Sequence, residues 1–120
     1  MEPLTFDSRD VGQTEEFLSK HADAPMGITE IATAARVSAR ALQYAFRRHL
    51  NTTPLGHLRQ VRMARAHDEL KTGDPAATTV AATAARWGFF HPGRFAHSYK
   101  AEYGCAPSET LNASAEPRHP

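Results

Sequence analysis

The segment from residue 32 to residue 54 occurs a second time, in altered form, between residues 84 and 107. Equivalent positions lie 52 residues apart before the middle of the unit and 53 residues apart after it. The pairs are Ala32 with Ala84, Val37 with Phe89, Phe46 with Tyr99, Arg47 with Lys100, and Pro54 with Pro107. An internal repeat constrains the fold more strongly than any single motif, because both copies must form the same supersecondary unit. The sequence therefore predicts one small unit that is used twice.

Apolar residues recur at spacings of three and four, and no segment alternates with period two. This pattern predicts an all-α chain of about seven helices. We expect them at about residues 8–21, 30–35, 39–50, 54–71, 78–87, 92–103 and 107–111. The expected N-caps, whose side chains accept a hydrogen bond from a free backbone N–H, are Ser8, Thr29 and Ser38. The expected apolar stripe of the longest helix comprises Leu55, Leu58, Val61, Met63, Ala66 and Leu70.

The charges are distributed unevenly, although the net charge is only +1. Seven of the 13 acidic residues lie within residues 1–30, whereas residues 31–67 contain seven arginines and no acid. Residues 75–101 also lack acids and carry Arg86, Arg94 and Lys100. A local basic surface of this kind is typical of a protein that binds a polyanion. The alternative is a solvated basic face.

Several classes of function lack the residues that they need. No apolar run approaches the roughly 20 residues of a membrane span, and the first ten residues include three acids and do not resemble a signal peptide. Cys105 is the only cysteine, which excludes an internal disulfide and a cysteine-based zinc cluster. No nucleophile, base or metal set for catalysis is present. We therefore expect a cytoplasmic protein that is not an enzyme and has no metal, cofactor or membrane contact.

The remaining histidines and aromatic residues have structural interpretations. His91 and His97 are six residues apart, which places them on different helix faces and argues against a shared metal. The histidines expected at the surface or near phosphates are His49, His57 and His67. The aromatic residues expected in the core of the second unit are Trp87, Phe89, Phe90 and Phe95. Cys105 is expected to be inert packing beside a helix end.

Each copy of the repeat consists of an alanine, a turn position, a hydrophobic residue and a second helix. The turn position is Arg36 in the first copy and Gly88 in the second, where glycine supplies the positive φ that such a turn can need. This order is typical of a helix-turn-helix, whose second helix enters the DNA major groove. In the first copy, the face expected to be buried comprises Leu42, Phe46 and Leu50. The opposite face presents Arg40, Gln43, Tyr44 and Arg47.

Two sets of residues resemble the signature of AraC/XylS-type transcription regulators. One set comprises Gly88, Phe89, Phe95, Tyr99, Lys100, Gly104 and Pro107. The other comprises Val37, Ser38, Leu42, Phe46, Arg47, Pro54, Arg62, Met63, Ala66 and Leu70. The resemblance covers about residues 8–111. It implies two helix-turn-helix subdomains, at 8–53 and 72–111, held by a linking helix at 54–71. The first residues, 1–7, are expected to be a flexible lead-in and residues 112–120 a disordered tail.

The resemblance also implies roles for individual residues. The implied base-reading residues are Arg40, Gln43 and Tyr44 in the first subdomain and Pro92, Gly93, Arg94 and His97 in the second. The implied phosphate contacts are Ser38, Arg47, Arg48, Arg62 and Lys100. Because Pro92 and Gly93 offer no side-chain hydrogen bond, we expect the first recognition helix to dominate specificity. Three positions depart from the family pattern, namely Arg36 and Asn51 in place of a frequent glycine and Thr83 in place of a larger apolar residue.

The predicted function is sequence-specific binding of double-stranded DNA by two recognition helices in successive major-groove segments, as a transcription regulator and activator. RNA polymerase is the expected protein partner by family resemblance. Any effector-sensing or dimerisation domain is expected to lie outside these 120 residues. The alternative is a helical protein-interaction module whose basic face meets an acidic partner.

Overall fold

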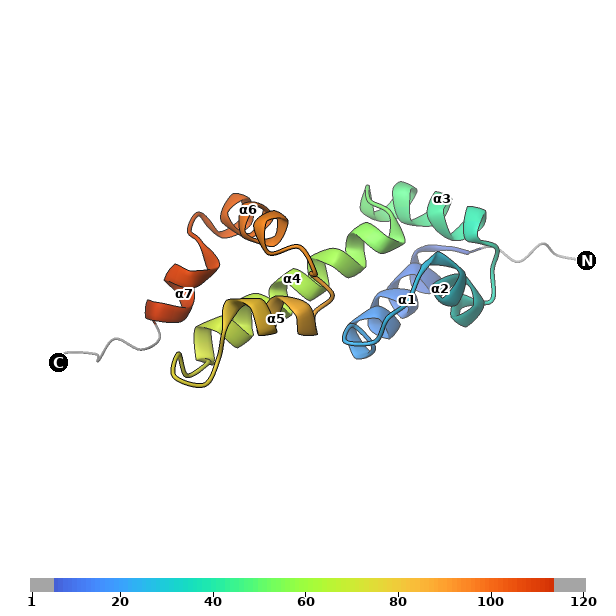
Figure 1. Ribbon diagram of the computed structural model, residues 1–120. Coiled ribbons are helices and arrows are strands. Elements are labelled where there is room, and N and C mark those ends of the chain that lie inside the picture. Colours follow the sequence, from blue (N-terminus) through green and yellow to red (C-terminus); the bar gives the residue numbers. More distant parts are fainter. Residues whose placement is uncertain (1–5, 114–120) are drawn as a thin grey trace, which may run out of the picture. The chain divides into compact units, whose positions relative to one another are not determined.

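The computed structural model describes residues 6–113, which form seven helices and no strand. Their bounds are α1 Ser8–Lys20, α2 Ile28–Ala35, α3 Ala39–Leu50, α4 Pro54–Thr72, α5 Val80–Arg86, α6 Pro92–Tyr103 and α7 Pro107–Ala113 (Figure 1). The all-α prediction with about seven helices is therefore confirmed. Most of the expected lead-in and tail, residues 1–5 and 114–120, lies outside the described residues. None of the described helices is long and apolar enough to cross a membrane.

The chain divides into two compact units after Val61. The division falls inside α4, the longest helix, so each unit includes one part of it. Helices α1, α2 and α3 pack against one another in the first unit, and α5, α6 and α7 do so in the second. Each unit therefore has a three-helix core of its own, completed by a segment of α4.

The core of the first unit is built from apolar residues at helical spacing. Val11 and Leu18 of α1, Ile31 of α2, and Leu42 and Phe46 of α3 are all at most 1% exposed. Helix α1 begins at Ser8, the residue expected to be its cap, so its N-cap lies one residue earlier than predicted. Asp7, not Ser8, is the N-cap, and its carboxylate accepts from the backbone N–H groups of Arg9 and Asp10. Asp10 in turn accepts from the Asp7 N–H, which completes a capping box.

The helix α2 begins before the position expected from the sequence. Its N-cap is Gly27 and not Thr29, because the carboxylate of Glu30 accepts the Gly27 N–H at 2.7 Å. Ser38 caps α3 as predicted, since its Oγ accepts the Ala41 N–H at 3.1 Å. At the other end of α3, Asn51 takes the predicted left-handed conformation, with φ 55°.

The turn between α2 and α3 is a left-handed one at Arg36, with φ 62° and ψ 37°. The Val37 N–H donates to the carbonyl of Ala32 at 3.2 Å across this turn. A residue other than glycine costs about 1 kcal/mol in this conformation, because its Cβ approaches the following carbonyl oxygen. The turn is thus held by its backbone hydrogen bond although Arg36 strains it.

The second unit repeats this turn with different side chains. Gly88 has φ 85°, and the Phe89 N–H donates to the carbonyl of Ala84 at 2.8 Å. Ala84 is 1% exposed and lies where α5 meets its neighbours. Because the bond Phe89–Ala84 matches Val37–Ala32, both copies of the sequence repeat form the same helix-turn-helix geometry.

The second unit has an aromatic core. Its buried members are Met63, Ala66, Leu70, Ala84, Phe95, Tyr99 and Leu111. Thr83, which stands in place of a larger apolar residue, is only 1% exposed. The predicted stripe along α4 is wrong at its first member, because Leu55 is 43% exposed, whereas Leu58 and Leu70 are buried. The buried residues of α4 do not form one continuous apolar face. The part of the helix up to Val61 belongs to the first unit, and Met63, Ala66 and Leu70 are buried in the core of the second unit.

Candidate nucleic-acid interface

The helix α3 presents a polar face opposite its buried residues. Leu42 and Phe46 are fully buried, whereas Arg40, Gln43 and Tyr44 are exposed. The three exposed side chains lie at positions i, i+3 and i+4, which places them on one side of the helix. The structure therefore brings together the three residues predicted to read bases in the first unit. Tyr44 is 67% exposed, so its ring is available for contact.

A second group of polar residues flanks this face. Arg47 and Arg48 are exposed in the last turn of α3, and no carboxylate within residues 6–113 pairs with them or with Arg40. Ser38 lies at the opposite end of the helix, where its oxygen caps the backbone. Its hydroxyl proton is still able to donate. Three guanidinium groups on one helix without a counter-ion form a positive surface that would attract a polyanion.

The first two turns of α6 carry the other predicted base-reading residues. Pro92, Gly93, Arg94 and His97 are all exposed, whereas Phe95 and Tyr99 are buried. A side chain at Gly93 would meet no atom within 4 Å, so this surface is open. Lys100, a predicted phosphate contact, is exposed on the same helix. The structure therefore places the residues of the second unit as the helix-turn-helix interpretation requires, although their role is still a prediction.

Arg62 differs from the other predicted phosphate contacts because it is half-buried. Its guanidinium lies against the turn of the second unit, 3.4 Å from where a Cβ on Gly88 would be. Burial lowers the pKa of Arg62. This residue therefore contributes to the packing of the second turn, whichever groups its remaining donors bind.

Sequence reasoning missed a polar cluster that ties α4 to α5. The carboxylate of Glu69 accepts from the Trp87 Nε1–H at 3.2 Å and forms an ion pair with Arg86. Arg65 places its guanidinium carbon 5.8 Å from the centre of the Trp87 ring. Burial raises the pKa of Glu69, but the hydrogen bonds from Arg86 and Trp87 outweigh it and the pKa is lowered. No pattern in the sequence identifies this cluster, because its members are 17 and 18 residues apart.

The histidine His67 is not the surface residue that the sequence predicted. Its ring stacks on Tyr103 with centroids 3.8 Å apart, and its Nδ1 lies 2.6 Å from the Tyr99 hydroxyl. The Tyr99 hydroxyl also donates to Thr110 at 2.8 Å, and Thr110 lies 3.4 Å from Cys105. Burial lowers the pKa of His67, and the nearby positive charge of Lys71 lowers it further. These residues form a structural network between α4, α6 and α7.

His57 also contacts other side chains of the first unit. It lies 3.6 Å from the Glu15 carboxylate and 6.1 Å, centre to centre, from the Phe46 ring. Within the described residues, no group of three or more histidine, cysteine or acidic side chains could hold a metal ion.

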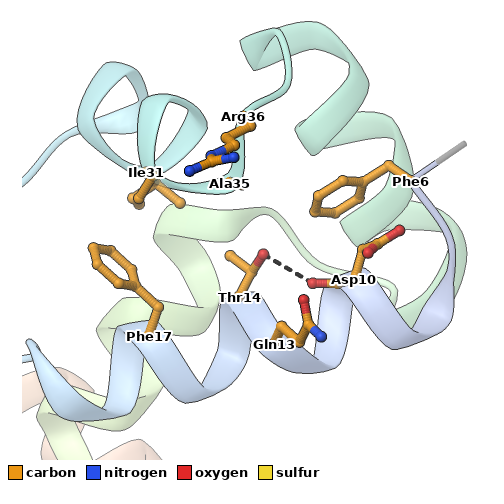
Figure 2. A pocket seen from close by; sticks show the side chains of 9 residues that line it. Phe6, Asp10, Gln13, Thr14, Phe17, Ile31, Ala35 and Arg36 are labelled. Carbon is orange, nitrogen blue, oxygen red and sulfur yellow. Dashed lines mark hydrogen bonds between the residues drawn. The ribbon is translucent and has the colours of Figure 1, made fainter. Parts of the chain in front are cut away.

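A pocket of about 250 Å³ lies between α1 and α2 in the first unit. Figure 2 shows Phe6 and Phe17 at its two ends, with Thr14 between them. The Thr14 hydroxyl already donates to the Asp10 carbonyl at 3.0 Å, and the Asp10 carboxylate is used in the cap of α1. The volume is below the usual range of ligand pockets, about 300–1,000 Å³. The pocket is therefore a packing gap between two helices.

Together, the fold and the exposed polar helices define a helix-turn-helix DNA-binding domain. A family model described as a helix-turn-helix domain matches residues 31–113. A crystal structure of a probable AraC family transcriptional regulator from Rhodopseudomonas palustris is similar, with 34% identity and a TM-score of 0.82 over 91% of this chain and 100% of that one. The chain belongs to the AraC/XylS family of transcription regulators, which is not an enzyme family.

Two sequence relatives support the same assignment. A probable thc operon regulatory protein from Rhodococcus erythropolis is 43% identical over 96 residues. The XylDLEGF operon transcriptional activator 1 from Pseudomonas putida is 30% identical over 96 residues. Both matches cover 80% of this chain, and the chain spans 29% of the length of each relative.

Proposed function

We propose that this chain recognises a specific duplex DNA sequence by placing α3 and α6 in two successive segments of the major groove. The observation that carries the proposal is the polar face of α3, where Arg40, Gln43 and Tyr44 are exposed together on a helix whose other side is buried. Arginine pairs bidentately with guanine and glutamine with adenine. The DNA would set the spacing between α3 and α6, since neighbouring segments of the major groove on one face of the duplex are about 34 Å apart.

The proposed contacts divide into two classes. The base-reading residues are Arg40, Gln43 and Tyr44 on α3 and Pro92, Gly93, Arg94 and His97 on α6. The phosphate contacts are Ser38, Arg47, Arg48, Arg62 and Lys100. Phosphate contacts position the protein but carry no sequence information. We place the two readers in subdomains at 8–53 and 72–111, with residues 54–71 as the link.

Activation is the proposed outcome of binding, with RNA polymerase as the protein partner. The support is the similarity to the XylDLEGF operon transcriptional activator 1, a protein whose described role is activation.

Selection of bound sequences from a random duplex pool tests the proposal directly. The full chain should enrich one motif with two short half-sites about one helical turn apart. Its affinity should fall with salt on a log–log slope of about −4, since four cationic phosphate contacts each contribute about −0.9. Weak binding without any enriched motif would contradict the proposal and favour the protein-interaction alternative.

A further inference from the structure

Phe90 is an exposed aromatic residue beside the recognition helix of the second unit. Its side chain is 73% exposed, although the sequence predicted it in the core with its neighbours. Phe89 takes the core position instead, with its ring centre 5.1 Å from that of Phe95. A hydrophobic residue just before an N-cap often packs on the fourth helical residue as a staple. Here that fourth residue is Phe95, and Phe89 covers it, so the fold gives no reason for an aromatic ring at position 90.

Phe90 lies at the start of the helix that is expected to enter the major groove. It directly precedes His91, the N-cap of α6, and the N-terminal residues of a recognition helix are those that contact base edges. The next two residues, Pro92 and Gly93, have no side-chain hydrogen-bond donor or acceptor. These first helical residues therefore cannot read bases by side-chain hydrogen bonds. Arg94 and His97 can still donate hydrogen bonds further along the helix. At the start of the helix, the mode of readout open to Phe90 is apolar contact with the C5-methyl group of thymine, for which phenylalanine is suited.

We propose that Phe90 determines specificity by packing on the methyl group of a thymine in the half-site read by α6. This inference rests on the proposed function, since it requires α6 to lie in the major groove. The exposed ring would lose contact with water on binding, and the open surface at Gly93 leaves room for a base edge to approach. The helix α6 would thus combine hydrogen bonds from Arg94 and His97 with an apolar contact from Phe90.

Replacing thymine by deoxyuridine tests the proposal, because the substitution removes only the methyl group. The duplex is the motif enriched by the full chain, and each thymine is replaced in turn while affinity is measured by fluorescence anisotropy. One thymine in the α6 half-site should show a loss of about fourfold in affinity for the wild-type chain, the factor expected for one buried methylene-sized group. The Phe90→Ala variant should bind the thymine and uracil duplexes equally at that position.

Two control variants separate this contact from general effects. Phe90→Leu keeps an apolar side chain and should retain part of the discrimination. Tyr44→Ala removes the other highly exposed aromatic ring and should leave the discrimination at the α6 thymine unchanged. Circular dichroism should show the wild-type helical content for Phe90→Ala, since an exposed side chain contributes little to the core.

The outcomes distinguish this inference from the proposed function. If the wild-type chain enriches a motif but discriminates against uracil nowhere, or if the α6 half-site contains no selected thymine, the role of Phe90 is wrong and the DNA-binding proposal stands. If Phe90→Ala keeps the full discrimination, weakens all sequences alike, or only changes the oligomeric state in sedimentation, Phe90 is not the reader. If no motif is enriched at all, the proposed function fails and the inference fails with it.

Discussion

Replacing Glu69 by alanine should lower the free energy of unfolding of the second unit by about 2 kcal/mol. Most of this cost comes from the Trp87 N–H, which would lose its charged acceptor at 3.2 Å, a bond worth about 1.5–3 kcal/mol. The ion pair with Arg86 adds less than about 1 kcal/mol, because the Arg86 side chain is 58% exposed and water competes for it. Glu69→Gln keeps an oxygen that can accept from Trp87, so it should cost about 1 kcal/mol or less.

Urea denaturation measures these differences. Trp87 is the only tryptophan in the chain, so its fluorescence reports the second unit for the Glu69 variants. Arg86→Ala is the matched control, since it removes the ion pair but leaves the indole bond intact. Equal losses in the free energy of unfolding for the glutamine and alanine variants would show that the charge of Glu69, and not its hydrogen bond with Trp87, stabilises the second unit. The role assigned to that hydrogen bond would then be wrong. A cost as large for Arg86→Ala as for Glu69→Ala would refute it in the same way.

The lowered pKa of Glu69 adds a pH dependence to the same experiment. A carboxyl group whose pKa is lower in the folded state stabilises the fold above its unfolded value, near 4.5, and this stability is lost as the pH falls through the folded pKa. The wild-type chain should therefore lose stability below about pH 4.5 more steeply than Glu69→Gln. Parallel curves for the two proteins would contradict the assignment.

Three further results are expected. Arg40→Ala should relax base preference in the selected motif at a cost of about 1–3 kcal/mol of binding free energy. Arg47→Ala should instead weaken binding to all sequences alike and reduce the salt slope by about 1. An anisotropy titration at several salt concentrations measures both effects, and the opposite pattern would contradict the two roles. Gly93→Ala should raise the melting temperature, since its Cβ meets open space and alanine gains about 1 kcal/mol in a helix, yet it should reduce affinity for the selected DNA; unchanged affinity would remove Gly93 from the interface. The pKa of His67 is lowered, so its neutral form is favoured in the fold and stability should fall as the pH drops below about 6.5; His67→Gln should lack this decline, and a denaturation series that shows it in both proteins would place its source elsewhere.

The apolar spacing of the sequence was sufficient to predict the helices and the turn of each repeat. Leu42 and Phe46 fix which side of α3 is buried, and Ser38 marks where the helix begins, so the polar face opposite them can be deduced directly. These features are local, because the residues that define them lie within one or two turns of each other. Local periodicity therefore accounts for most of the fold, whereas of the three predicted N-caps only Ser38 is confirmed.

The errors at Phe90 and His67 concern residues whose environment depends on a second element. Two adjacent phenylalanines cannot both point into one core, and only the packing of Phe95 shows that Phe89 is the buried one. Similarly, His67 is drawn into the interior by Tyr99 and Tyr103, which lie more than 30 residues further along the chain. Spacing within a helix carries no information about such partners, so the cluster around Glu69 and the exposed Phe90 were not predictable.

The matching backbone hydrogen bonds of the two turns have a consequence for how this protein can change. The turn of each unit is specified by a main-chain bond, from Val37 to Ala32 in one and from Phe89 to Ala84 in the other, and not by the side chain at the turn. An arginine can therefore occupy one turn and a glycine the other at a cost of about 1 kcal/mol. Because the turn does not depend on identical side chains, the two units can carry different side chains on α3 and α6 while the main-chain geometry of the turn stays the same.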